Sequence, residues 1–129
     1  MGEDKILVFL DSSAERAAVH CQRMTEADQA RTFWTQTVVE VISIIKDYLP
    51  RLEEVSLEHD LGEEPYVHSG SDKCGMEVVR YLERCKSSDY ASVKFIVHTH
   101  NEIAGQKMTR RLRIAGYNVC YSPFGLERK

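Results

Sequence analysis

The chain has 129 residues, of which 43% are hydrophobic, and this is enough apolar material for the core of one domain spanning residues 1–129. The net charge of −3 argues against a protein that coats nucleic acid through its overall charge, although a local basic face remains compatible with it. The four cysteines show no zinc-finger or CxxC spacing, and neither a signal peptide nor a long apolar segment is visible. We therefore expect a cytoplasmic protein with reduced thiols and no membrane contact.

Apolar segments of strand length alternate with segments of helical periodicity along the chain. The first, from Lys5 to Leu10, is apolar at almost every position, as expected for a strand buried on both faces of a parallel sheet. Further strands are predicted at 32–36, 53–58, 93–98 and 118–121, and helices at 14–24, 38–49, 75–86 and 102–115, with a polar connection at 25–31 and a long loop at 63–74 that could cover a site. This alternation predicts an α/β fold with a doubly wound parallel five-stranded sheet.

Three of the predicted strands end in side chains suited to acid–base chemistry or metal binding. Asp11 follows the first strand, Glu58-His59-Asp60 follows the third, and His98 and His100 follow the fourth. In an open parallel sheet the carboxyl ends of the strands meet at one edge, and ligands bind there. We therefore interpret the three strand ends as parts of one site.

The carboxylates of this site, Asp11, Glu58 and Asp60, are candidate ligands of a divalent cation. Oxygen ligands suit Mg²⁺ or Mn²⁺. A carboxylate at the end of a buried strand, such as Asp11, is costly unless it meets a cation or a hydrogen-bond donor. Structural roles are the alternatives, because Asp11 could cap the following helix and Glu58 could form a salt bridge with Arg16 or a lysine.

The histidines His59, His98 and His100 are candidate catalytic residues for proton transfer. The neighbouring Asp60 would raise the pKa of His59 and favour one tautomer, as acid–base catalysis requires. His98 and His100 are predicted to project to the same side, because side chains alternate along an extended segment. A lone histidine is more often structural, but two at one strand end opposite acids favour a functional role.

Asn101 and Arg16 are candidate ligand-binding residues. Asn101 can cap the helix predicted at 102–115, whose free backbone N–H groups could bind an anion. His20 is predicted to lie on a helix surface and His68 in the long loop, and both are weaker candidates for the site.

Several motifs are together similar to one family. They are Leu10-Asp11 with Glu15-Arg16, Ser56-Leu-Glu-His-Asp-Leu-Gly62, and His98-Thr-His-Asn101. Through them the chain resembles the cyclic-phosphate processing receiver-like domains, which share the response-regulator receiver fold, and the resemblance covers nearly the whole chain. It implies a flavodoxin-like sheet in receiver order, with an acidic pocket that holds a divalent cation.

Three positions depart from the pattern that this resemblance implies. Ser12 stands where the family usually has a second acid, and Glu58 stands where it usually has an aspartate. Ser122 precedes Pro123 where a receiver carries a lysine, so ordinary phosphorelay signalling is not expected.

The residues and the resemblance together predict a phosphoesterase that acts on a cyclic or terminal phosphate of a nucleotide or RNA end. A bound Mg²⁺ or Mn²⁺ ion or a metal-free mechanism with two histidines could each perform this chemistry, and the sequence leaves both open. A phage or bacterial factor that degrades a cyclic nucleotide signal would be a special case of this phosphoesterase. The alternative is a catalytically silent receiver-like module that binds a nucleotide or a protein partner.

Overall fold

Five parallel strands form one sheet in the order β2-β1-β3-β4-β5. The computed structural model describes residues 5–62 and 68–123. The strands are β1 (Ile6–Leu10), β2 (Thr32–Thr35), β3 (Leu52–Leu57), β4 (Lys94–Val97) and β5 (Asn118–Tyr121). The predicted α/β fold with a parallel sheet in receiver order is therefore confirmed.

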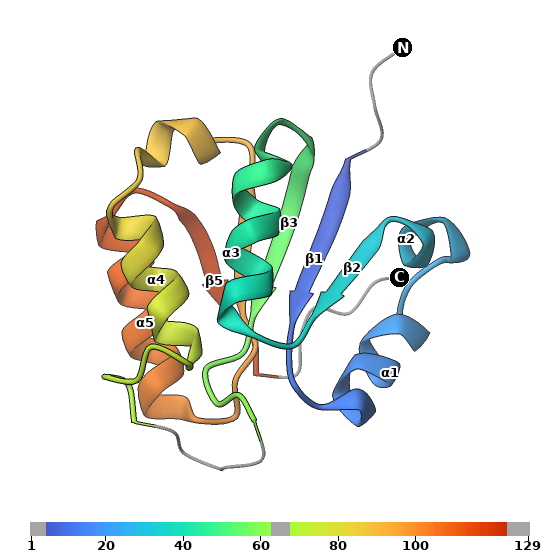
Figure 1. Ribbon diagram of the computed structural model, residues 1–129, viewed down its shortest axis with the longest axis horizontal. Coiled ribbons are helices and arrows are strands. Elements are labelled where there is room, and N and C mark those ends of the chain that lie inside the picture. The colour runs from blue at the N-terminus through green and yellow to red at the C-terminus, as the bar shows by residue number, and fades with distance from the viewer. Residues whose placement is uncertain (1–4, 63–67, 124–129) are drawn as a thin grey trace.

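Helices connect the strands and cover the sheet (Figure 1). They are α1 (Ala14–Gln22), α2 (Glu26–Ala30), α3 (Val38–Asp47), α4 (Gly75–Glu83) and α5 (Glu102–Ile114), with short 3₁₀ turns η1 (Leu49–Arg51) and η2 (Ser87–Tyr90). Each predicted helix is present. Within the described residues, no helix has the length and apolar character needed to cross a bilayer.

The segment 25–31, predicted to be a polar connection, instead contains the helix α2. The Thr25 side chain accepts a hydrogen bond from the backbone N–H of Asp28 and so caps the first turn. None of the five residues of this helix is buried. A helix without a buried face needs no apolar periodicity in its sequence, so the capping Thr25 is the signal that marks where α2 begins.

The two faces of the sheet have different environments. Val8, Val55 and Phe95 lie in one register row, and they belong to the hydrophobic core that the sheet forms with α3, α4 and α5. The next row contains Phe9 and Ser56, whose side chains point to the opposite face because side chains alternate along a strand. Phe9 shares a pocket with side chains of α1, so α1 lies beside this second face.

The start of α4 lies tightly against the chain that leaves β3. The backbone N–H of Gly75 donates to the carbonyl of His59 at 2.8 Å. A Cβ atom at position 75 would lie only 2.0 Å from the carbonyl oxygen of Glu58, so no residue other than glycine fits here. This contact fixes where the Glu58–Asp60 turn sits at the edge of the sheet.

Candidate functional site

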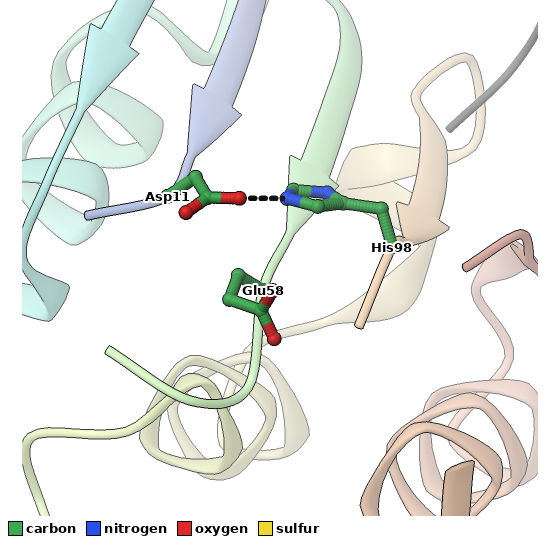
Figure 2. A group of neighbouring side chains, drawn as sticks. All are labelled: Asp11, Glu58 and His98. Carbon is green, nitrogen blue, oxygen red and sulfur yellow. Dashed lines mark hydrogen bonds and ion pairs between the residues drawn. The ribbon is translucent and has the colours of Figure 1, made fainter. Parts of the chain in front are cut away.

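Asp11, Glu58 and His98 come together at the carboxyl edge of the sheet, where they directly follow β1, β3 and β4. The backbone N–H of Glu58 donates to the carbonyl of Leu10 at 3.1 Å, and that of His98 to the carbonyl of Leu57 at 2.9 Å. The three residues therefore continue the register of adjacent strands. One ligand atom of each lies within 4.8 Å of the others, and all three residues are buried (Figure 2).

Asp11 is surrounded by hydrogen-bond donors. Its Oδ1 accepts from the backbone N–H of Ser13 at 2.9 Å and from Nη2 of Arg16 at 2.8 Å, while Oδ2 accepts from Nε of Arg16 at 2.8 Å. Burial alone would raise the pKa of Asp11, but the hydrogen bonds from His98 and Arg16 outweigh it and lower the pKa to about 2. The backbone carbonyl of Asp11 also accepts from the indole N–H of Trp34 at 2.7 Å.

His98 is held through both ring nitrogens. Its Nε2 lies 3.2 Å from Oδ2 of Asp11, and its Nδ1 lies 2.7 Å from the hydroxyl of Ser56. An ionised carboxylate can only accept a hydrogen bond, so Nε2 carries a proton that points to Asp11, while the Ser56 hydroxyl can donate to or accept from Nδ1. The ring also stacks on Phe9, with centroids 4.4 Å apart. His98 is therefore held in a fixed orientation with Nε2 directed at Asp11.

Glu58 turns back toward its own chain. Its Oε1 accepts hydrogen bonds from the backbone N–H groups of His59 at 2.8 Å and Asp60 at 3.1 Å. Its Oε2 lies 3.6 Å from Nη2 of Arg16, which is the salt bridge expected as the structural alternative for this residue. One carboxylate thus organises the turn after β3 and faces the cluster as well.

The cluster fits a divalent cation under two conditions. Two carboxylates and one imidazole form a mixed donor set that Mn²⁺ accepts. Arg16 supplies positive charge to Asp11 and Glu58, so it would have to turn away from them; its side chain is 44% exposed and free space lies beside it. His98 would also have to present an unprotonated Nε2.

The family model for the cyclic-phosphate processing receiver domain matches residues 6–114. The chain belongs to this family. No curated protein is similar enough to the chain to match it. Among solved structures, the signal receiver domain of a protein described as a Luxo repressor from Vibrio parahaemolyticus is 14% identical, with 94% of this chain and 80% of that chain covered and a TM-score of 0.59. The Mn²⁺-bound form of the response regulator Rcp1 is also 14% identical, with coverages of 91% and 78% and a TM-score of 0.56.

His59 and Asp60 of this receiver domain lie outside the cluster of possible cation ligands found among the described residues. Nδ1 of His59 lies 2.6 Å from Oδ1 of Asp60, and Nε2 lies 3.0 Å from the hydroxyl of Ser69. The same Asp60 oxygen accepts from the side-chain amide of Asn101 at 3.3 Å. Burial lowers the pKa of His59, but hydrogen bonds with Cys74 and Asp60 outweigh it, so the pKa is raised.

The predicted pairing of Asp60 with His59, which raises the pKa of the imidazole, is confirmed, whereas Asp60 lies outside the cluster in which it was predicted to bind a cation. His59 is fully buried, with both ring nitrogens hydrogen-bonded inside the protein. Asp60 connects His59 to Asn101, and Asn101 accepts from the backbone N–H of Ala104 as the predicted cap of α5. These residues join the end of β3 to the start of α5, and His98 takes the position in the cluster that was predicted for Asp60.

A pocket of about 210 Å³, here called the α1 pocket, opens beside the cluster. It is lined by Phe9, Glu15, Arg16, Val19, His20, Arg23, His98, His100 and Pro123. His98 and His100 share it, as expected from their predicted projection to one side. His20, predicted to lie on a helix surface, also lines it, and the signal for this is the spacing of Arg16, Val19, His20 and Arg23 along one face of α1.

Proposed function

We propose that this receiver-family domain is a phosphoesterase that processes a cyclic or terminal phosphate on a nucleotide or RNA end. The observation that carries the proposal is the shared position of His98 and Arg16, which contact Asp11 and also line the α1 pocket. A guanidinium and an imidazole N–H side by side provide donors for phosphoryl oxygens. Membership of a family described as cyclic-phosphate processing supports the same chemistry.

Two histidines divide the proton transfers between them. His100 is exposed and lines the pocket, so it can take a proton from the attacking water. As the water oxygen bonds to phosphorus, the bond from phosphorus to the leaving ribose oxygen breaks, and the imidazolium form of His98 gives the proton on Nε2 to that oxygen and becomes neutral. Asp11 stabilises the charged form of His98 through the contact at 3.2 Å. Proton exchange between the two rings through solvent restores the starting state.

A divalent cation is the second way in which this site could support the reaction. Asp11, Glu58 and His98 would hold it, and a bound cation supplies polarisation of a phosphoryl oxygen. The Mn²⁺-bound form of Rcp1, which has the same fold, lends support to a divalent cation in this domain.

A catalytically silent module that binds a nucleotide or protein partner is the second candidate, and one observation favours it. Arg16 covers both carboxylate oxygens of Asp11 and thereby neutralises the charge that would attract a cation. Ser12, at the position of the missing second acid, exchanges hydrogen bonds with the backbone of Gly62 at 2.9 and 3.1 Å. Both features describe a site that is stable without a metal.

A turnover screen separates the two functions. The substrates are nucleoside 2′,3′-cyclic and 3′,5′-cyclic monophosphates and an RNA oligonucleotide with a 3′-terminal phosphate, each with Mn²⁺ and with a chelator. The phosphoesterase proposal expects release of a phosphomonoester or of inorganic phosphate from at least one substrate. Binding of these compounds without any turnover would favour the silent module, and turnover that survives the chelator would assign the reaction to the two histidines.

A further inference from the structure

We infer that the α1 pocket binds the base of a nucleotide substrate while Arg16 and His98 hold its phosphate, an inference that rests on the proposed function. The pocket and the cation cluster share His98, and Arg16 of the pocket lining contacts Asp11 of the cluster. When the phosphate of a ligand binds Arg16 and His98, the rest of the ligand extends either into the α1 pocket or into solvent. The chemical character of the pocket decides between these two arrangements.

Stacked rings form one wall of the pocket. The rings of His20 and Phe9 are parallel within 16°, with centroids 4.0 Å apart, and the rings of Phe9 and His98 are parallel within 8° at 4.4 Å. Phe9 and His98 are buried, so the ring of this stack that a ligand can reach is that of the half-buried His20. A flat aromatic ring accepts a nucleobase by stacking, whatever the base. Val19, on the helix side, is 42% exposed although it is apolar. It offers an apolar contact to the edge or face of a bound ring.

The size and charge of the pocket match a single ring system on an anionic ligand. Its volume of about 210 Å³ is below the roughly 300–1,000 Å³ of sites that enclose a whole drug-sized molecule. The lining contains two arginines, Arg16 and Arg23, and three histidines against one acid, Glu15. The charge of Arg16 is balanced by Asp11, so the lining favours an anionic ligand through the N–H donors of its arginines and histidines and not through net charge. A nucleoside phosphate combines the required flat ring with the required charge.

Paired probes with and without a base test this inference. The probes are adenosine 2′,3′-cyclic monophosphorothioate, which is slow to hydrolyse, and the corresponding 1-O-methylribose 2′,3′-cyclic phosphorothioate. Calorimetry on the wild type should show binding about tenfold tighter for the adenosine probe, the scale of one base–aromatic stack. Val19→Trp fills the pocket and should remove this difference while leaving the affinity of the base-free probe unchanged. The matched control is Val39→Trp, because Val39 on α3 is 79% exposed and lies outside the pocket lining.

A second variant keeps the test decisive if Val19→Trp does not fold. His20→Ala removes one ring of the stacked wall and should also reduce the preference for the adenosine probe severalfold. Equal affinities of the two probes for the wild type, or no measurable binding of either, would overturn the inference, as would a preference that survives both variants. Turnover of adenosine 2′,3′-cyclic monophosphate, measured in parallel, distinguishes failure of this inference from failure of the proposed function. Turnover without a preference for the adenosine probe would support the phosphoesterase and contradict base binding in the α1 pocket. A preference for the adenosine probe without turnover would support base binding and contradict the phosphoesterase.

Discussion

The guanidinium of Arg16 donates two hydrogen bonds of 2.8 Å to the two carboxylate oxygens of Asp11. Bidentate pairs of this geometry are strong because both groups are charged and planar. Asp11 is fully buried whereas the Arg16 side chain is 44% exposed. Arg16 therefore acts as the movable counter-ion of a fixed acid, and any cation at this site has to compete with it.

Replacing Arg16 should make the site bind Mn²⁺ more tightly. Hydrogen bonds to charged groups contribute about 1.5–3 kcal/mol, so Arg16→Ala should lower the Kd for Mn²⁺ roughly tenfold or more. The variant should also be less stable without metal, because it leaves a buried carboxylate without its partner, and Mn²⁺ should restore the stability. Manganese titration followed by electron paramagnetic resonance measures the first effect, and thermal unfolding measures the second. Arg23→Ala, at the C-cap of the same helix, is the control, and equal Mn²⁺ affinities for both variants would exclude Asp11 as a ligand.

The two histidines of the α1 pocket should both be needed for turnover. His100 is exposed, so His100→Ala should stay folded. His98 is buried and bonded to Asp11 and Ser56, so His98→Gln is the better variant because it keeps size and a donor but cannot transfer a proton. Each change should lower kcat by about a hundredfold or more, with the double variant little worse than either single one. His68→Ala should leave kcat unchanged, and full activity of both single variants would contradict the proposed mechanism.

Acid should remove a defined part of the stability through Asp11. Its pKa falls from an ordinary 3.8 to about 2 in the folded protein, and this difference corresponds to about 2 kcal/mol. A lowered folded-state pKa stabilises the protein above the unfolded value, and the contribution is lost as the pH falls from about 4 to about 2. Urea unfolding across this pH range measures the loss. Asp11→Asn should flatten the curve there, and a wild-type slope that persists in this variant would assign it to other carboxylates.

The close contact at Gly75 predicts a strong effect of a single methyl group. Gly75→Ala places a Cβ atom 2.0 Å from the Glu58 carbonyl oxygen, a backbone atom that cannot move without shifting the end of β3. The free energy of unfolding should fall by about 3 kcal/mol or more. Gly70→Ala is the matched control, since the nearest atom there belongs to the His68 side chain. Similar stabilities of the two variants in denaturant unfolding would show that α4 can slide away from the β3 turn.

The proximity of Asp11, Glu58 and His98 could be predicted from sequence, because it depends only on where the strands end. Each follows an apolar strand directly, and parallel strands share one carboxyl edge. The roles of His59 and Asp60 could not be predicted in the same way. Once the strand has ended, the turn decides which side chain points to the cluster, and here the turn is fixed by the bonds of Glu58 to the next two backbone N–H groups.

The position of His20 depends on how α1 is rotated about its axis. Of the residues of α1, Ala17 alone is buried. The sequence of this helix therefore has no apolar stripe from which its rotation could be predicted. The pairing of Arg16 with Asp11 and the stacking of His20 on Phe9 set it instead, and both link residues that only the fold brings into contact.

The indole of Trp34 gives the molecule a built-in optical probe of its acid cluster. Trp34 is the single tryptophan of the chain, the residue is 42% exposed, and its indole N–H donates to the backbone carbonyl of Asp11. Indole emission responds to the polarity and hydrogen bonding around the ring. Intrinsic fluorescence can therefore follow the arrival of a cation or phosphate at Asp11 in real time, on unlabelled protein and without a coupled assay.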